Sequence, residues 1–154
     1  MHRKNPCNYN SPTYDATDYG PKPFVANIHN AAIQNTNFRS TWWTGTHLQL
    51  TLMSIPACGE IGLEIHPHVD QFLRIESGQG LVQMGDNQDL LNYQANVCGG
   101  SVIFIPAGTW HNLTNTGNRP IKLYSIYAPS QHPHGTVHET KEIADASEYD
   151  HFIP

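Results

Sequence analysis

The chain has little charge and no long apolar run, which excludes two classes of partner. Charged residues make up 14% of its 154 residues, and eight Lys and Arg against 13 Asp and Glu give a net charge of −5. The eight basic residues do not cluster, which is unlike a nucleic-acid-binding surface. No apolar run approaches the length of a membrane span. We therefore expect neither a nucleic acid nor a membrane as a partner.

Cysteine is also scarce. Cys7, Cys58 and Cys98 make an odd number, and no two of them have the CxxC spacing. This pattern is unlike a disulfide scaffold or a zinc ribbon and fits a reducing compartment. No apolar stretch follows the first six residues as it would in a secretory signal. The sequence therefore predicts a cytoplasmic protein.

Glycine and proline, in contrast, recur along the whole chain. The 12 Gly and 11 Pro separate short apolar runs, as is typical of an all-β protein. The length suits one domain with a hydrophobic core. We expect strands at 47–55, 61–66, 71–76, 81–84, 89–93, 101–105, 113–115 and 121–127, which predict a sandwich or barrel.

The pattern divides the chain into three parts. Residues 1–40 form an N-terminal arm and leading segment, in which 1–23 carry no periodicity. Residues 41–129 form the β-barrel. Residues 130–154 form a His-rich loop followed by a short surface helix at 139–149.

Adjacent aromatic residues indicate a second copy of the chain as a partner. Trp42 and Trp43 are consecutive, and successive side chains of a strand face opposite ways. We expect one of them to enter the core and the other to face a partner subunit. Phe72 should also lie on the outer face, so we predict a homodimer.

A stretch near the middle of the chain presents a histidine from a rigid position. Apolar residues 102–105 form a buried strand, and the turn from Pro106 to Gly108 follows. His111 then stands at the end of the structure that the strand builds. A histidine held in this way is well suited to bind a metal ion.

A second polar stretch lies upstream. Alternation along a strand puts Glu64, His66 and His68 on one face, and Pro67 predicts a corner before Gln71 begins the next strand. Together with His111, these side chains form a cluster of imidazoles and oxygen donors. Two histidines and a carboxylate are a common set for a catalytic divalent metal ion with open positions.

The first stretch resembles the second motif of the cupin superfamily, G-x5-P-x-G-x2-H-x3-N. Gly100, Pro106, Gly108, His111 and Asn115 occupy every fixed position of that motif. The resemblance covers roughly residues 47–128 and implies an all-β fold. The expected architecture is a double-stranded β-helix (jelly-roll) cupin barrel, with an N-terminal arm and a short C-terminal helix.

The upstream stretch resembles the first cupin motif, G-x5-H-x-H-x3,4-E-x6-G, but departs from it. The spacing from Gln71 to Gly78 is kept, so Gln71 stands where the family usually has a glutamate ligand. Counting back from Gln71 gives Glu64 and His66 as the preceding pair. A second register would use His66 and His68, with a loop one residue shorter. The spacing favours the first register.

The resemblance implies that Glu64, His66, Gln71 and His111 bind a divalent metal ion, which could be Zn, Mn, Fe, Ni or Co. Such a metal would act as a Lewis acid on a small oxygenated substrate. Small cupins similar to this one are often described as mannose-6-phosphate isomerase-like, so the resemblance implies an isomerase acting on a sugar or sugar phosphate.

An isomerase also needs a base that moves a proton between two carbons. The predicted catalytic residues are His68, Asp70 and His134, and His132 and His138 are further candidates from the same loop as His134. A metal-dependent dioxygenase and a non-catalytic ligand-binding or structural cupin are the alternatives. Few basic residues are expected near the site, which weakens the case for a phosphorylated substrate.

Overall fold

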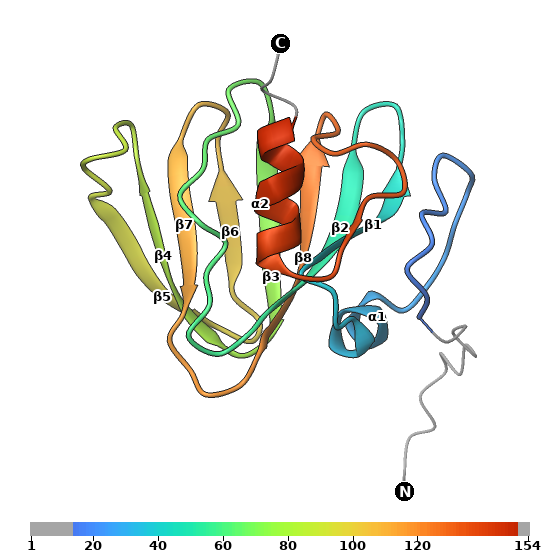
Figure 1. Cartoon of the computed structure of the whole chain (residues 1–154), viewed down its shortest axis with the longest axis horizontal. Coiled ribbons are helices and arrows are strands. Elements are labelled where there is room, and N and C mark those ends of the chain that lie inside the picture. The colour runs from blue at the N-terminus through green and yellow to red at the C-terminus, as the bar shows by residue number, and fades with distance from the viewer. Residues whose placement is uncertain (1–13, 151–154) are drawn as a thin grey trace, which may run out of the picture.

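The computed structural model describes residues 14–150, so residues 1–13 of the predicted arm lie outside the described part. Two helices and nine strands make up the fold (Figure 1). In chain order these are α1 (Ile28–Gln34), β1 (Arg39–Thr44), β2 (Gln49–Ile55), β3 (Asp70–Ser77), β4 (Gln79–Gly85), β5 (Tyr93–Cys98), β6 (Val102–Ile105), β7 (Trp110–Asn115), β8 (Ile121–Ala128), β9 (Val137–His138) and α2 (Lys141–Asp150).

The strands form two antiparallel sheets, which confirms the predicted jelly-roll fold. The larger sheet has the order β6-β3-β8-β2-β1-β9 and the smaller one the order β5-β4-β7. The main core contains Met53, Leu73 and Leu123 of the larger sheet together with Val82 and Leu113 of the smaller sheet. The core therefore lies between the two sheets.

Two predicted strands were wrong. Residues 61–66 form no strand, and only Glu60 and Glu64 make single bridges to β7. Gly62 adopts a φ of +100°, which interrupts an extended chain. The strand predicted at 89–93 is a turn in which Leu90 N–H donates to Asn87 O, and β5 begins only at Tyr93.

The inner face of the larger sheet changes from apolar to polar along its strands. On β2, Ile55 and Met53 are followed by Thr51 and Gln49, and all four are fully buried. On β8, likewise, Leu123 precedes the buried Ser125. Since Thr51 pairs with Ser125, the polar ends of the two strands lie side by side. One end of the barrel interior is therefore polar.

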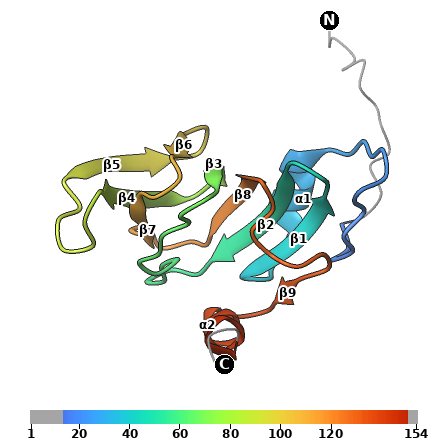
Figure 2. The same ribbon diagram turned by 90° about the horizontal axis from the view of Figure 1, so that it is seen from above.

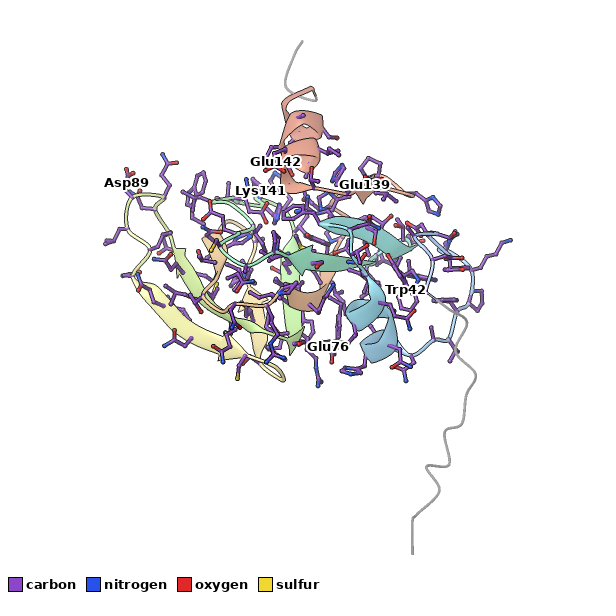
Figure 3. All side chains as sticks on the ribbon, turned by 60° about the horizontal axis from the view of Figure 1, so that its bottom comes forward. Trp42, Glu76, Asp89, Glu139, Lys141 and Glu142 are labelled. Carbon is purple, nitrogen blue, oxygen red and sulfur yellow. The ribbon has the colours of Figure 1, made fainter. Side chains whose placement is uncertain are left out.

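The outer face of the larger sheet carries a second apolar cluster. Trp42 and Leu52 pack there against Ala31 and Ala32 of α1, and Figure 3 shows Trp42 beside this helix. The register shifts between Thr41 and Trp43, so Trp42 is the extra residue of a β-bulge. Alternation from the inward Thr41 already turns Trp42 outward, and the bulge lets Trp43 share the outer face with Leu50 instead of pointing into the core. The expectation that one of the two tryptophans enters the core between the sheets was therefore wrong.

The C-terminal segment lies on the opposite side of the larger sheet from α1 (Figure 2). Ala144 of α2 is buried in the main core, whereas α1 belongs to the outer cluster. The predicted C-terminal helix is thus confirmed, beginning at Lys141. Within residues 14–150, no helix combines the length and apolarity needed to cross a bilayer.

Candidate metal centre

Glu64, His66 and His111 meet at the polar end of the barrel. Glu64 Oε1 lies 3.2 Å from His111 Nε2 and 3.4 Å from His66 Nε2. One potential ligand atom from each residue lies within 4.8 Å of the other two. Both histidines are buried, and the Glu64 side chain is 18% exposed. The three residues, called the metal triad below, are placed to bind a metal ion.

Backbone hydrogen bonds hold the triad in place although residues 61–66 form no strand. The N–H groups of Glu64 and His111 each donate to the carbonyl of the other residue, at 3.0 Å. Gly108 N–H donates to the carbonyl of His66 at 2.9 Å. Gly108 has a φ of +79°, a conformation that favours glycine. The Pro106–Gly108 turn therefore holds the His66 backbone, and the pairing with Glu64 holds the His111 backbone.

The hydrogen bonding of His111 leaves a lone pair facing Glu64. A carbonyl oxygen can only accept, so the contact of 2.9 Å to Thr109 O requires a proton on His111 Nδ1. In a neutral ring, Nε2 then presents a lone pair 3.2 Å from the Glu64 carboxylate. Two acceptors at this distance repel each other unless a proton or a metal ion lies between them.

The distances within the triad fit a metal ion. Ligand bonds of about 2.1 Å at angles between 90° and 110° separate neighbouring ligand atoms by about 3.0–3.4 Å. The two contacts of Glu64 with the histidines match this range. Two imidazoles and a carboxylate also suit a divalent transition metal. The triad therefore meets both the geometric and the chemical requirements.

Glu64 stays ionised in this environment. Burial alone would raise the pKa of its carboxyl group. The imidazoles of His111 and His66, with a further contribution from the charge of Arg39, outweigh burial and hold the pKa of Glu64 well below its usual range. An anionic oxygen is consequently ready to bind a cation at neutral pH.

Gln71 lies on the same inner face of the barrel. Its side-chain Nε2 donates to Ser125 Oγ at 2.9 Å, which fixes the orientation of the amide. The amide oxygen Oε1 is buried and has no hydrogen-bond partner. An unpaired buried oxygen is costly unless it has a ligand. Gln71 thus offers the donor that a fourth ligand needs, and this role stays a prediction.

The structure brings Glu64, rather than His68, next to His66 and His111. His68 is exposed, in agreement with the register that pairs Glu64 with His66. The carboxylate of Asp70 accepts a hydrogen bond from Ala107 N–H and so holds the turn before β7.

His134 Nε2 lies 2.9 Å from Gly20 O and 3.3 Å from Asp18 Oδ1, so its ring faces the N-terminal segment. Asp70 and His134 thus contact residues other than the triad, and His68 is exposed. Their catalytic role stays a prediction.

Three residues near the triad were missed or underestimated. The ring of Tyr127 lies 5.7 Å from that of His66 and 5.2 Å from that of His132. Burial, followed by the charge of Arg39, lowers the pKa of His132 to about 3, so its imidazole is neutral. Arg39 is 2% exposed and belongs to the leading segment, where no motif indicated a role. The inward alternation of β8 was the one signal that pointed to Tyr127.

A cavity of about 470 Å³ lies beside the triad. Glu64 and His66 form part of its wall, and the C-terminal segment supplies His132, His138 and Glu148. The loop that carries His132 is fixed by the buried Gln49, whose amide oxygen accepts from His132 N–H and whose Nε2 donates to His132 O. The histidine-rich loop therefore covers the end of the barrel that holds the triad.

The fold and this site agree with comparison to known proteins. The family model of the cupin domain matches residues 51–127, and the chain belongs to the cupin family.

An uncharacterised protein of Bacillus subtilis, YrkC, is 64% identical over 131 residues, which cover 85% of this chain and 70% of that protein. An uncharacterised protein of Acanthamoeba polyphaga mimivirus is 39% identical over 115 residues, covering 74% of this chain and 70% of that protein. The crystal structure of BH2720 from Bacillus halodurans has a TM-score of 0.84 and 66% identity, and the match covers 84% of this chain and 98% of that one.

Proposed function

We propose that this cupin binds a divalent metal ion through Glu64, His66, Gln71 and His111 and uses it to hold a small oxygenated substrate. The observation that carries the proposal is the convergence of Glu64 Oε1 on His111 Nε2 at 3.2 Å and on His66 Nε2 at 3.4 Å. When bound, the metal would supply Lewis-acid polarisation of substrate oxygens at its open positions. The cavity beside the triad supplies the space for that substrate.

The surrounding residues support binding and orientation. Ser125 turns the Gln71 amide so that its oxygen is free, and Thr109 fixes the tautomer of His111. The loop over the barrel end shields the triad from bulk water, which strengthens electrostatic interactions inside. The first two effects hold the donors in place before a substrate arrives.

An isomerase of the mannose-6-phosphate type is our finer hypothesis. It requires a base with a pKa near the working pH. The ring of His132 packs on Tyr127, which also contacts His66 of the triad. The pKa of His132 is about 3, so its imidazole can accept a hydrogen bond but is too weakly basic to take up a proton at neutral pH. This observation favours the Lewis-acid role over proton transfer, and the isomerase hypothesis rests on the predicted bases His68, Asp70 and His134.

Metal analysis of the untagged protein tests the proposal. We expect near-stoichiometric divalent metal in the wild type and its loss in Glu64→Ala and His111→Ala variants, measured by elemental mass spectrometry. His68→Ala is the matched control and should keep its metal, because His68 is exposed and lies outside the triad. Protein that stays metal-free after both aerobic and anaerobic preparation would contradict the proposal.

Activity assays separate the finer hypotheses. Aldose–ketose interconversion should be measured on sugars with and without phosphate, using metal-loaded wild type and the His111→Ala variant. Substrate-dependent oxygen uptake by iron-loaded protein would instead support a dioxygenase. A ligand that raises the melting temperature and is recovered unchanged would support a binding protein.

A further inference from the structure

Arg39 is a buried cation that the metal centre does not require. It pairs with Met53 of β2 and with His138 of β9, so its side chain points into the barrel with theirs. The side chain is 3% exposed. Burying a guanidinium is costly unless an anion pairs with it.

The described residues neutralise Arg39 only in part. The nearest carboxylate that contacts it is Glu148, with Oε1 at 3.9 Å from Nη1, which is beyond hydrogen-bonding distance. The Nε–H group of Arg39 is buried and has no hydrogen-bond partner. The charge of Arg39 also contributes to the low pKa of Glu64, but Glu64 already faces both triad histidines. A donor on Arg39 is therefore available to a further anion.

Other buried polar atoms of the larger sheet and of the loops beside it also lack a partner. Besides Arg39 Nε, the buried atoms without a partner are Thr51 Oγ1, His66 Nε2, Gln71 Oε1, His132 Nε2 and His138 Nδ1. They come from β1, β2, β3, β9 and two loops, and Trp42 Nε1 is the other buried unpaired atom in the described part of the chain. Buried polar groups normally have partners. His66 Nε2 and Gln71 Oε1 are proposed metal ligands, whereas Arg39 pairs with His138 of the cavity wall and its charge acts on Glu64 and His132. A polar ligand held beside the triad would therefore lie near the guanidinium.

We propose that Arg39 binds the carboxylate of a small 2-hydroxy or 2-oxo acid whose neighbouring oxygens reach the metal triad. This inference rests on the proposed metal function and narrows its substrate class from oxygenated molecules in general to monocarboxylates. A guanidinium matches the planar geometry of a carboxylate. A single buried cation balances one negative charge better than the two of a phosphate monoester.

Glu148 competes for the same cation. Its side chain is 52% exposed and lies in the cavity wall, at the end of the C-terminal segment that covers the triad. A substrate carboxylate that approached Arg39 would have to displace the Glu148 carboxylate or bind beside it. Removing the negative charge of Glu148 should therefore strengthen anion binding, whereas removing the positive charge of Arg39 should weaken it.

The test is isothermal titration calorimetry of the full chain with lactate and with lactamide, its neutral counterpart. Both are titrated into manganese-loaded and chelator-treated protein, with mannose and mannose 6-phosphate as further probes. We expect lactate to bind more tightly than lactamide by roughly 10- to 100-fold, the contribution of a charge-assisted hydrogen bond. Arg39→Gln should remove this preference, Arg39→Lys should keep part of it, and Glu148→Gln should increase it.

Arg74→Gln is the matched control, because Arg74 is an exposed arginine that pairs with Glu76 on the outer side. Metal content is measured for each variant, so a protein without metal would contradict the proposed function separately. Arg39-dependent selection of lactate by chelator-treated protein would still support the anion site. Equal affinity for lactate and lactamide, unchanged lactate affinity in Arg39→Gln, or binding of mannose or mannose 6-phosphate in place of lactate would overturn the inference.

Discussion

At the scale of single residues, Gln71 is the departure from the usual cupin pattern that has the clearest chemical consequence. Its neutral amide leaves Glu64 as the single anionic donor among the four proposed ligands. Restoring a carboxylate by Gln71→Glu should tighten divalent metal binding by about tenfold or more, since a second anion adds Coulomb attraction at close range. Titration of the chelator-treated protein with manganese measures this change.

Ser125 should affect metal affinity indirectly, by holding the Gln71 side chain in place. It accepts the hydrogen bond that fixes the Gln71 amide, at 2.9 Å. Loss of such a supporting partner typically weakens metal binding by about 10–100-fold. Ser125→Ala is compared with Ser77→Ala at the far end of β3, which should leave the affinity unchanged. Equal metal affinities of the two serine variants would show that Gln71 does not bind the metal.

The site residues that were predicted are marked by motifs within a short stretch of sequence, whereas the missed residues are placed by contacts between distant stretches. His111 follows from an intact motif, and the choice of Glu64 over His68 follows from the distance to Gln71 along the chain. Arg39 has no such signal, because its inward direction depends on pairing with Met53 and His138, which are remote in sequence.

At the scale of elements, the C-terminal loop brings a titratable group into the barrel end. Burial lowers the pKa of His132 from 6.5 to about 3, so the folded state binds fewer protons than the unfolded state between these values. Stability should then fall as the pH drops below about 6.5, with a slope approaching 1.4 kcal/mol per pH unit.

Chemical unfolding at pH 7 and pH 5, in the presence of a chelator, tests this dependence. His132→Gln should lose less stability than the wild type over that interval, because glutamine does not titrate. His47→Gln replaces an exposed histidine and should behave like the wild type. Parallel losses in all three proteins would show that His132 does not carry the effect.

Elements were predicted well where apolar residues alternate and poorly where a turn or a bulge interrupts them. Strands β3, β6 and β8 were expected almost at their observed positions. All four residues of β6 are apolar, but Val102 and Phe104 are exposed, so the expectation that the whole strand is buried was wrong. Residues 61–66 alternate in the same way, but Gly62 bends the chain and a single bridge at Glu64 replaces a ladder. That segment still delivers Glu64 and His66 to one place, so the site was predictable although the strand was wrong.

At the scale of the whole molecule, an apolar row crosses the outer face of the larger sheet. Pairing aligns Phe104, Phe72, Ile126, Leu50 and Trp43 on neighbouring strands from β6 to β1. The N-terminal segment and α1 pack on part of this face, as the outer cluster shows, but Phe104 at its edge is 68% exposed. The other four side chains of the row are half-buried. An apolar row that is open at one edge favours association.

We predict that this row forms the interface of a homodimer. In a two-fold dimer the row would lie against its own copy, so a charge placed in it meets the same charge across the axis. Light scattering after size exclusion should give twice the 17.2 kDa chain mass for the wild type at micromolar concentration and a monomer for Phe104→Glu. Tyr93→Glu is the control, because Tyr93 is similarly exposed but lies on β5 of the other sheet. A monomeric wild type would contradict the predicted dimer. A dimer that persists in Phe104→Glu and dissociates in Tyr93→Glu would show that the interface lies on the other sheet.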